Sequence, residues 1–138
     1  GRIYDMAPPN RIHQKLINQF TKVLGHHIEK NNGSCEVYPA PFAVFLNKDA
    51  KHTEPDISVI CDKNKLDNCG CNGAPDFIIE IVSPSSRKMD YSTKNTLYSD
   101  AGVREYWIVE PEKERTTPND LPDDEATNLL IKYGYYKR

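Results

Sequence analysis

The runs EPDISVIC (residues 54–61) and APDFIIEIV (residues 74–82) are rich in the β-branched and apolar residues that favour strands, yet each contains carboxylates. Asp56 directly precedes the strongly β-forming residues 57–61 of the first run, and Glu80 lies in the middle of five apolar residues of the second. A half-buried charge persists only where something positive meets it. A divalent metal ion is therefore the leading candidate for the partner of these two acids.

The spacing of the two acids predicts how the strands pair. Positions 56 and 80 are equidistant from residue 68, which lies inside a turn-rich stretch over 62–74. An antiparallel pair centred there places Asp56 opposite Glu80 with Cα atoms about 4.5 to 5.5 Å apart, so both carboxylates could reach one ion. Asp76 lies four residues before Glu80, roughly 13 Å away along the same strand, and cannot easily share that ion. The alternative role for Asp56 is to cap the turn that precedes its strand.

A helix over residues 88–101 is predicted to follow the second strand. Serines and a proline end the strand and offer caps, and Gly102 suits the left-handed position that closes a helix. Three residues recur along this helix at four-residue steps: Asp90, Lys94 and Tyr98. That spacing puts them on one face, from which Lys94 could extend toward Glu80. The alternative is an ordinary solvated ion pair between Asp90 and Lys94.

A longer helix is predicted near the start of the chain, from Ile12 to Ile28, because apolar residues repeat there at three- and four-residue steps. His13 lies on the edge of that apolar stripe. The sequence favours a partly buried core histidine over a group directed at a metal or a phosphate, since it has no partner in sequence.

Further strands are predicted on either side of the two central ones. Residues 35–46 form two extended pieces broken at Pro39-Ala40-Pro41, which suggests an edge or a bend. Residues 106–109 form a late strand, in which Trp107 is expected to be a core residue. The order of helix, strands, helix and strand predicts an α/β fold with a mixed sheet.

Several of these segments together resemble the Uma family of predicted endonucleases. The matching parts are GRIYDMAPP (1–9), the helix from near His13, EPDI (54–57), GAPDFIIEIVSPSS (73–86) and GVREYWIVE (102–110). The resemblance spans most of residues 1–115. It places the chain in the PD-(D/E)xK superfamily and implies a restriction-endonuclease-like core, in which a mixed β-sheet is flanked by helices.

The superfamily pattern places a lysine two residues after the second acid, whereas this chain has Val82 there, so the strict pattern fails. In the family that lysine commonly comes from the following helix, and Lys94 is the matching residue. The resemblance thus implies a Mg²⁺- or Mn²⁺-dependent DNA endonuclease. Asp56 and Glu80 would hold the metal with a strand carbonyl near Ile81, and Lys94 would complete the catalytic set.

Two other functions remain open from the sequence. One is a non-catalytic nucleic-acid-binding or assembly module with a relic site, and the other is a metal-dependent hydrolase of a smaller phosphate ester. A homodimer is expected only by analogy, because small nucleases of this kind often pair so as to cut both strands. Sequence preference and strand preference are not encoded in any motif of this chain.

The length and composition limit the number of domains and the class of protein. The 138 residues fit a single domain over 1–138, with a loose polar loop over 115–127. No apolar run approaches the roughly 18 residues needed to cross a membrane, and no secretory signal is evident, so a cytoplasmic location is predicted. A net charge of −2 argues against a strongly basic nucleic-acid coat. A local basic patch is still expected from residues that are near the site in sequence: Arg87, Lys88, Lys94 and Arg104.

The four cysteines are Cys35, Cys61, Cys69 and Cys71. A structural zinc site usually shows two pairs of ligands, and only Cys69 and Cys71 are close in sequence, so zinc is disfavoured. Without a secretory signal, all four are predicted to be reduced thiols.

Overall fold

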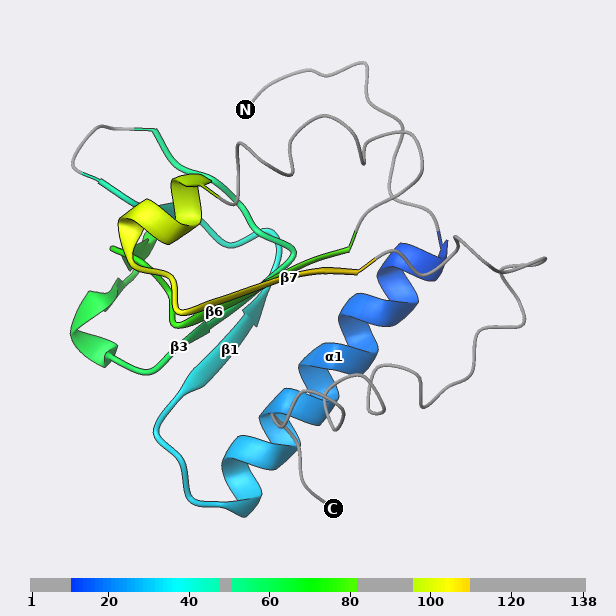
Figure 1. The fold of residues 1–138 in the computed structure, drawn as a ribbon. Helices are drawn as coiled ribbons and strands as arrows, with labels where there is room; N and C mark the ends of the chain where they lie inside the picture. Colours follow the sequence, from blue (N-terminus) through cyan, green and yellow to red (C-terminus); the bar gives the residue numbers. More distant parts are fainter. Residues whose placement is uncertain (1–10, 48–50, 82–95, 110–138) are drawn as a thin grey trace.

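The computed structural model describes residues 11–47, 51–81 and 96–109 (Figure 1). Its elements, in chain order, are α1 (Arg11–Lys30), β1 (Glu36–Pro39), β2 (Val44–Phe45), β3 (Ile57–Ile60), the 3-10 turn η1 (Lys63–Lys65), β4 (Leu66–Asp67), β5 (Gly70–Asn72), β6 (Phe77–Ile81) and β7 (Glu105–Val109). Residues 96–101 are helical and lead into β7. Within the described residues, no helix is long and apolar enough to cross a membrane.

The long helix α1 follows the predicted apolar stripe. Four residues at steps of four are buried on one face: Ile12, Leu16, Phe20 and Leu24. The helix ends at Lys30, two residues beyond the predicted Ile28, where Asn32 adopts a positive φ of 55° and the N–H of Gly33 donates to the carbonyl of Ile28 at 2.8 Å. The buried face packs on the sheet, mainly against β1 and β6.

The main sheet has four strands in the order β1-β3-β6-β7. The first three are antiparallel neighbours, and β6 pairs with β7 in parallel, so the predicted mixed sheet is confirmed. The proline-flanked strand β1 lies at one edge of this sheet, as Pro39 suggested. Figure 1 shows α1 running alongside the sheet, with the short helix of residues 96–101 on the opposite side of the strands from α1.

Both faces of the central strands are covered. In β3 and β6 every residue is buried, and alternate residues enter different layers. Ile57, Val59 and Ile79 belong to the core shared with α1, whereas Ile60 packs with Val44 and Cys71 in a second cluster. This explains why the two runs read as continuous apolar segments and not as a simple alternation.

The predicted pairing register is confirmed. Ile57 opposes Ile79 and Val59 opposes Phe77, which is the register in which position 56 faces position 80. The stretch between the strands, however, is not a simple turn. It contains β4 and β5, and β5 pairs in parallel with β2, so a second sheet of order β2-β5-β4 forms. Strands of two or three residues are too short to show a periodic pattern, which is why the sequence did not reveal them.

Gly70 is required at one point of this second sheet. Its φ is 140°, and a side chain there would place its Cβ 2.2 Å from the carbonyl oxygen of Ala43. The N–H of Cys71 donates to that same carbonyl at 2.9 Å. The close approach of two backbones therefore depends on the missing Cβ.

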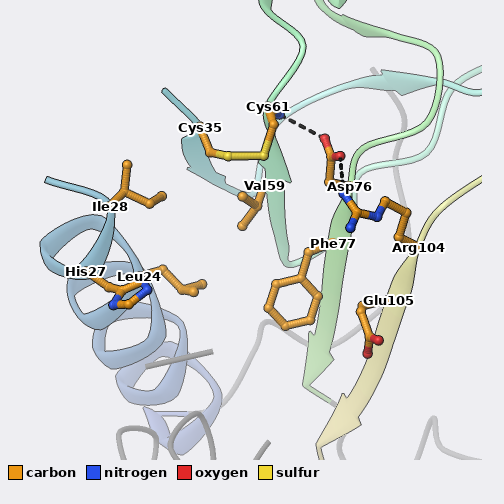
Figure 2. A pocket seen from close by; sticks show the side chains of 10 residues that line it. All are labelled: Leu24, His27, Ile28, Cys35, Val59, Cys61, Asp76, Phe77, Arg104 and Glu105. Atoms are coloured by element: carbon orange, nitrogen blue, oxygen red, sulfur yellow. Dashed lines mark hydrogen bonds and ion pairs between the residues drawn. A yellow bond between two sulfur atoms is a disulfide. The ribbon is translucent and has the colours of Figure 1, made fainter. Parts of the chain in front are cut away.

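The prediction that all four cysteines are reduced is wrong for two of them. Cys35, just before β1, and Cys61, just after β3, form a disulfide, whereas Cys69 and Cys71 are free. Figure 2 shows this bond beside the last turn of α1. The antiparallel pairing of β1 with β3 brings the two residues together, with Cα atoms 3.9 Å apart, and no sequence pattern signals that pairing.

Loss of this disulfide is expected to lower the free energy of unfolding by about 3 kcal/mol, because the bond closes a loop with a sequence separation of 26 and thereby restricts the unfolded chain. Cys35→Ser with Cys61→Ser should lower Tm by about 10 °C. Calorimetry with and without a phosphine reductant measures both effects. Cys69→Ser, at an exposed free thiol, is the control and should leave Tm unchanged. Four reactive thiols in the unreduced native protein would contradict the disulfide.

Candidate metal and catalytic site

Asp56 and Glu80 meet at the end of the β3–β6 pair, and each carboxylate is oriented by the other strand. The backbone N–H of Asp56 donates to Oε1 of Glu80 at 3.3 Å, and the N–H of Ile81 donates to Oδ2 of Asp56 at 2.7 Å. Glu80 is only 7% exposed, whereas the Asp56 side chain is 18% exposed. Two acids that are distant in sequence thus form one adjacent pair, as the register predicted.

Tyr98 holds the other oxygen of Glu80. Its side chain is fully buried, and its hydroxyl lies 3.3 Å from Oε2 of Glu80 and 3.3 Å from Oγ1 of Thr53. Burial, reinforced by the Glu80 charge, raises the pKa of Tyr98 far above its ordinary value. The hydroxyl therefore stays protonated and can donate to the carboxylate.

The predicted helix before β7 is described from residue 96 onward. Gly102, with φ 103°, follows its last turn, and the N–H of Val103 donates to the carbonyl of Tyr98 at 2.9 Å, so the expected glycine closure is confirmed. Asp90 and Lys94 lie outside the described residues, as does Val82. Tyr98, the third member of the predicted face, does turn toward Glu80.

His13 belongs to this site, which corrects the prediction of a core histidine. It lies in the first turns of α1, its side chain is 17% exposed, and its Nε2 is 3.2 Å from Oδ2 of Asp56. The hydrogen bond to Asp56 raises the pKa of His13 above its ordinary value, although burial opposes the shift. Its place at the edge of the apolar stripe was the available signal, but only the packing of α1 on the sheet reveals the partner.

Asp76 lies at the other end of β6, as the strand spacing predicted. Its Oδ1 accepts the N–H of Cys61 at 2.8 Å, and its Oδ2 is 3.5 Å from Nη1 of Arg104 (Figure 2). This pair borders a pocket of about 410 Å³ lined also by the disulfide and by Phe77. Arg104 is therefore not part of a basic patch around Asp56 and Glu80. Arg87, Lys88 and Lys94 lie outside the described residues.

The donor chemistry of the pair suits a hard cation. In the described part of the chain, no group of three or more histidine, cysteine or acidic side chains is arranged to hold a metal ion. Two carboxylates are nevertheless a sufficient protein contribution for Mg²⁺, which keeps several waters of its own. Among described residues, both contacts of the Asp56 carboxylate fall on Oδ2, so Oδ1 is the oxygen that can face an ion.

Tyr98→Phe tests how firmly Glu80 is held. Removal of the hydroxyl takes one donor from a buried carboxylate, so the free energy of unfolding should fall by about 1 to 2 kcal/mol and Mg²⁺ affinity should fall several-fold. Thermal melting and calorimetric titration with Mg²⁺ measure the two effects. Tyr38→Phe is the matched control, because that hydroxyl also donates to a carboxylate, Glu36, but on β1 at the edge of the sheet. An equal loss of Mg²⁺ affinity in the control would contradict a specific role for Tyr98.

The chain matches a known protein family and is similar to two known proteins. A family model named Uma2, described as "Putative restriction endonuclease", matches residues 1–132. A Synechocystis protein described as "Uncharacterized protein slr1290" is 25% identical over 110 residues, which is 79% of this chain and 57% of that protein.

A crystal structure described as a putative nuclease belonging to DUF820, from Anabaena variabilis, superposes with a TM-score of 0.60 at 24% identity. The match covers 82% of this chain and 64% of that one. The chain therefore spans about three fifths of the length of each of these two relatives. The structural match supports a restriction-endonuclease-like fold with a mixed sheet and flanking helices.

Proposed function

The chain belongs to the Uma2 family, and from this premise we propose that it is a nuclease that hydrolyses phosphodiester bonds of DNA with the help of bound Mg²⁺ or Mn²⁺. The observation that carries the proposal is the pairing of Asp56 with Glu80 at the end of two neighbouring strands. The family match favours nucleic acid as the substrate class, and the two carboxylates favour a hard divalent ion.

Asp56 and Glu80 are proposed as the metal ligands, with the carbonyl of Ile81 beside them. The N–H of Ile81 orients Asp56, and Tyr98 orients Glu80, so both carboxylates are preorganised by hydrogen bonds before an ion arrives. A divalent ion in such a site lowers the pKa of water and stabilises negative charge on a phosphate. His13 lies beside Asp56 with a partly exposed side chain, so it is well placed to hold a proton or a phosphate oxygen.

Lys94 is proposed as the positive residue of the site. It lies outside the described residues, and its assignment comes from the family pattern and from spacing. A helix that includes both Lys94 and Tyr98 places them on one face, and Tyr98 reaches Glu80. A lysine on that face could neutralise the phosphate or position the attacking water.

Incubation of plasmid DNA and of labelled oligonucleotides with Mg²⁺ or Mn²⁺ tests the function directly. A nuclease yields products that disappear when a chelator removes the ion. DNA binding without products would support the binding or assembly module, and neither binding nor products would leave the hydrolase of a smaller phosphate ester. Size-exclusion chromatography with light scattering would test the expected homodimer.

Two broader expectations also remain predictions. One is that residues 1–138 form a single domain. The other is a cytoplasmic location, for which the Cys35–Cys61 disulfide is unusual, because cytosolic thiols are normally kept reduced.

A further inference from the structure

A pocket of about 220 Å³, which we call the Leu97 pocket, is lined in part by Thr53, a residue that contacts Tyr98. Its walls come from β2 and the residues just after it, from the segment 51–53, and from the start of the helix at 96–101. The lining residues used below are Val44, Leu46, Lys51, His52, Thr53 and Leu97. Val44 and Thr53 form a bridge with N–O distances of 2.8 and 3.0 Å, so two of these walls are fixed to each other.

Three aliphatic residues line the Leu97 pocket: Val44, Leu46 and Leu97. Val44 is fully buried, Leu46 is half-buried, and Leu97 is 44% exposed. Leu97 is the one large hydrophobic residue that is exposed among those the structure describes. A single exposed leucine is ordinary on a protein surface, but here it lines a hollow that Lys51 also lines. The pocket is also smaller than the roughly 300 to 1,000 Å³ typical of sites for drug-sized ligands, which suits one ring system.

Polar residues also line the pocket, and one of them is a lysine. Lys51 is exposed there, and His52 is oriented by Glu54, whose Oε2 is 3.2 Å from its Nε2. The His52 ring also lies against Phe45 with ring centroids 5.4 Å apart. A small pocket lined by aliphatic side chains and one lysine matches an apolar ring that is joined to an anion, as in a nucleotide.

The pocket is connected to the proposed metal site. Thr53, which lines it, contacts the hydroxyl of Tyr98, and that hydroxyl contacts Oε2 of Glu80, so two contacts of 3.3 Å each separate the pocket wall from the carboxylate. A strand with a phosphate at Asp56 and Glu80 would thus have a neighbouring base within reach of the pocket.

Resting on the proposed nuclease function, we infer that the Leu97 pocket takes one unstacked nucleobase of the bound strand. Single-stranded or locally opened DNA is therefore the preferred substrate. Extraction of a base from a duplex costs a few kcal/mol, and this cost is least for a base that is already unpaired. Because this cost is smaller for a single strand than for a duplex, the pocket should make the protein bind the single strand more tightly.

Fluorescence anisotropy with a labelled oligothymidylate tests the inference, with Ca²⁺ in place of Mg²⁺ so that binding is measured apart from cleavage. Leu97→Ser and Lys51→Gln should each weaken binding of the single strand by about tenfold, because the first removes apolar area that the base would cover and the second removes a positive charge beside its phosphate. Affinity for the matching duplex should change by less than about twofold. Leu97→Met, which keeps an apolar side chain of similar volume, and Lys63→Gln, at an exposed lysine paired with Glu36, are the controls and should keep full affinity.

An abasic strand of the same length separates the base from the phosphates. It should bind the unmodified protein about tenfold more weakly than oligothymidylate, and Leu97→Ser should remove that difference. Equal binding of the abasic strand would show that the pocket recognises phosphate alone and would overturn the inference. Equal losses on single strand and duplex would overturn it too. Because the Lys51 variant and the abasic strand leave Leu97 intact, a folding defect in Leu97→Ser would not obscure the result.

Failure of this inference differs from failure of the nuclease proposal. Selective binding of the single strand through Leu97 without cleavage in Mg²⁺ would keep the pocket and exclude the nuclease. Cleavage that proceeds equally on single strand and duplex, and equally in Leu97→Ser, would keep the nuclease and exclude the pocket.

Discussion

Replacement of Glu80 by Gln is expected to reduce Mg²⁺-dependent DNA cleavage by at least about a thousandfold, and Asp56→Asn is expected to do the same. Metal stabilisation of the reacting phosphate contributes several kcal/mol, and each 1.4 kcal/mol is tenfold in rate. Both replacements keep the shape of the side chain, so the hydrogen bonds from Asp56 N–H, Ile81 N–H and Tyr98 can still form in part. The loss should therefore come from the missing charges and not from unfolding.

Asp76→Asn is the matched control for these two variants. Asp76 lies just before β6, the strand that carries Glu80, but it accepts the N–H of Cys61 and pairs with the exposed Arg104 at the opposite end of that strand. An asparagine oxygen can still accept that N–H, and an exposed ion pair contributes little. Calorimetric titration should show Mg²⁺ binding that the two site variants remove and the control keeps. Equal loss in all three variants would refute the assignment of the metal ligands.

Lys94→Ala is expected to reduce cleavage by about a hundredfold to a thousandfold while Mg²⁺ affinity and Tm change little. The reason is that the lysine would act on charge that develops in the transition state and would not hold the ion. Cleavage rates at saturating Mg²⁺, with calorimetry on the same variant, separate the two effects. Lys22→Ala, at an exposed lysine of α1, is the control for loss of one positive charge.

The variant Val82→Lys with Lys94→Ala extends this test. It restores the superfamily position for the lysine, two residues after Glu80, and a two-residue step is the spacing of side chains that share one face of a strand. Partial recovery of cleavage is expected in the double variant. Full activity of Lys94→Ala alone, under conditions in which Glu80→Gln is inactive, would show that Lys94 is a surface residue.

Tyr98 links the site to the rest of the fold. It is buried between the helix of residues 96–101 and β7, where its ring packs edge-on against Tyr106 with centroids 4.9 Å apart. Its hydroxyl contacts both Glu80 and Thr53. A single side chain therefore fixes a proposed metal ligand and a wall of the Leu97 pocket, so substitutions at Tyr98 should affect both.

The sequence by itself determined the features that depend on local periodicity. The stripe from Ile12 to Leu24 predicted α1, because a helix buries one face at steps of three and four. The symmetric placement of Asp56 and Glu80 about residue 68 predicted the register of β3 with β6, because opposed residues in an antiparallel pair have a constant sum of positions. The four-residue step from Asp76 to Glu80 likewise predicted that Asp76 lies too far along the strand to share a metal ion with Glu80.

The tertiary structure alone decided the contacts between segments that share no local pattern. His13 reaches Asp56 because α1 packs across the sheet, and Cys35 bonds to Cys61 because β1 pairs with β3. The second sheet escaped prediction because its strands are two or three residues long and its parallel partners are distant in the chain. Such contacts depend on how elements pack after they form, and a single sequence carries no periodic signal for them.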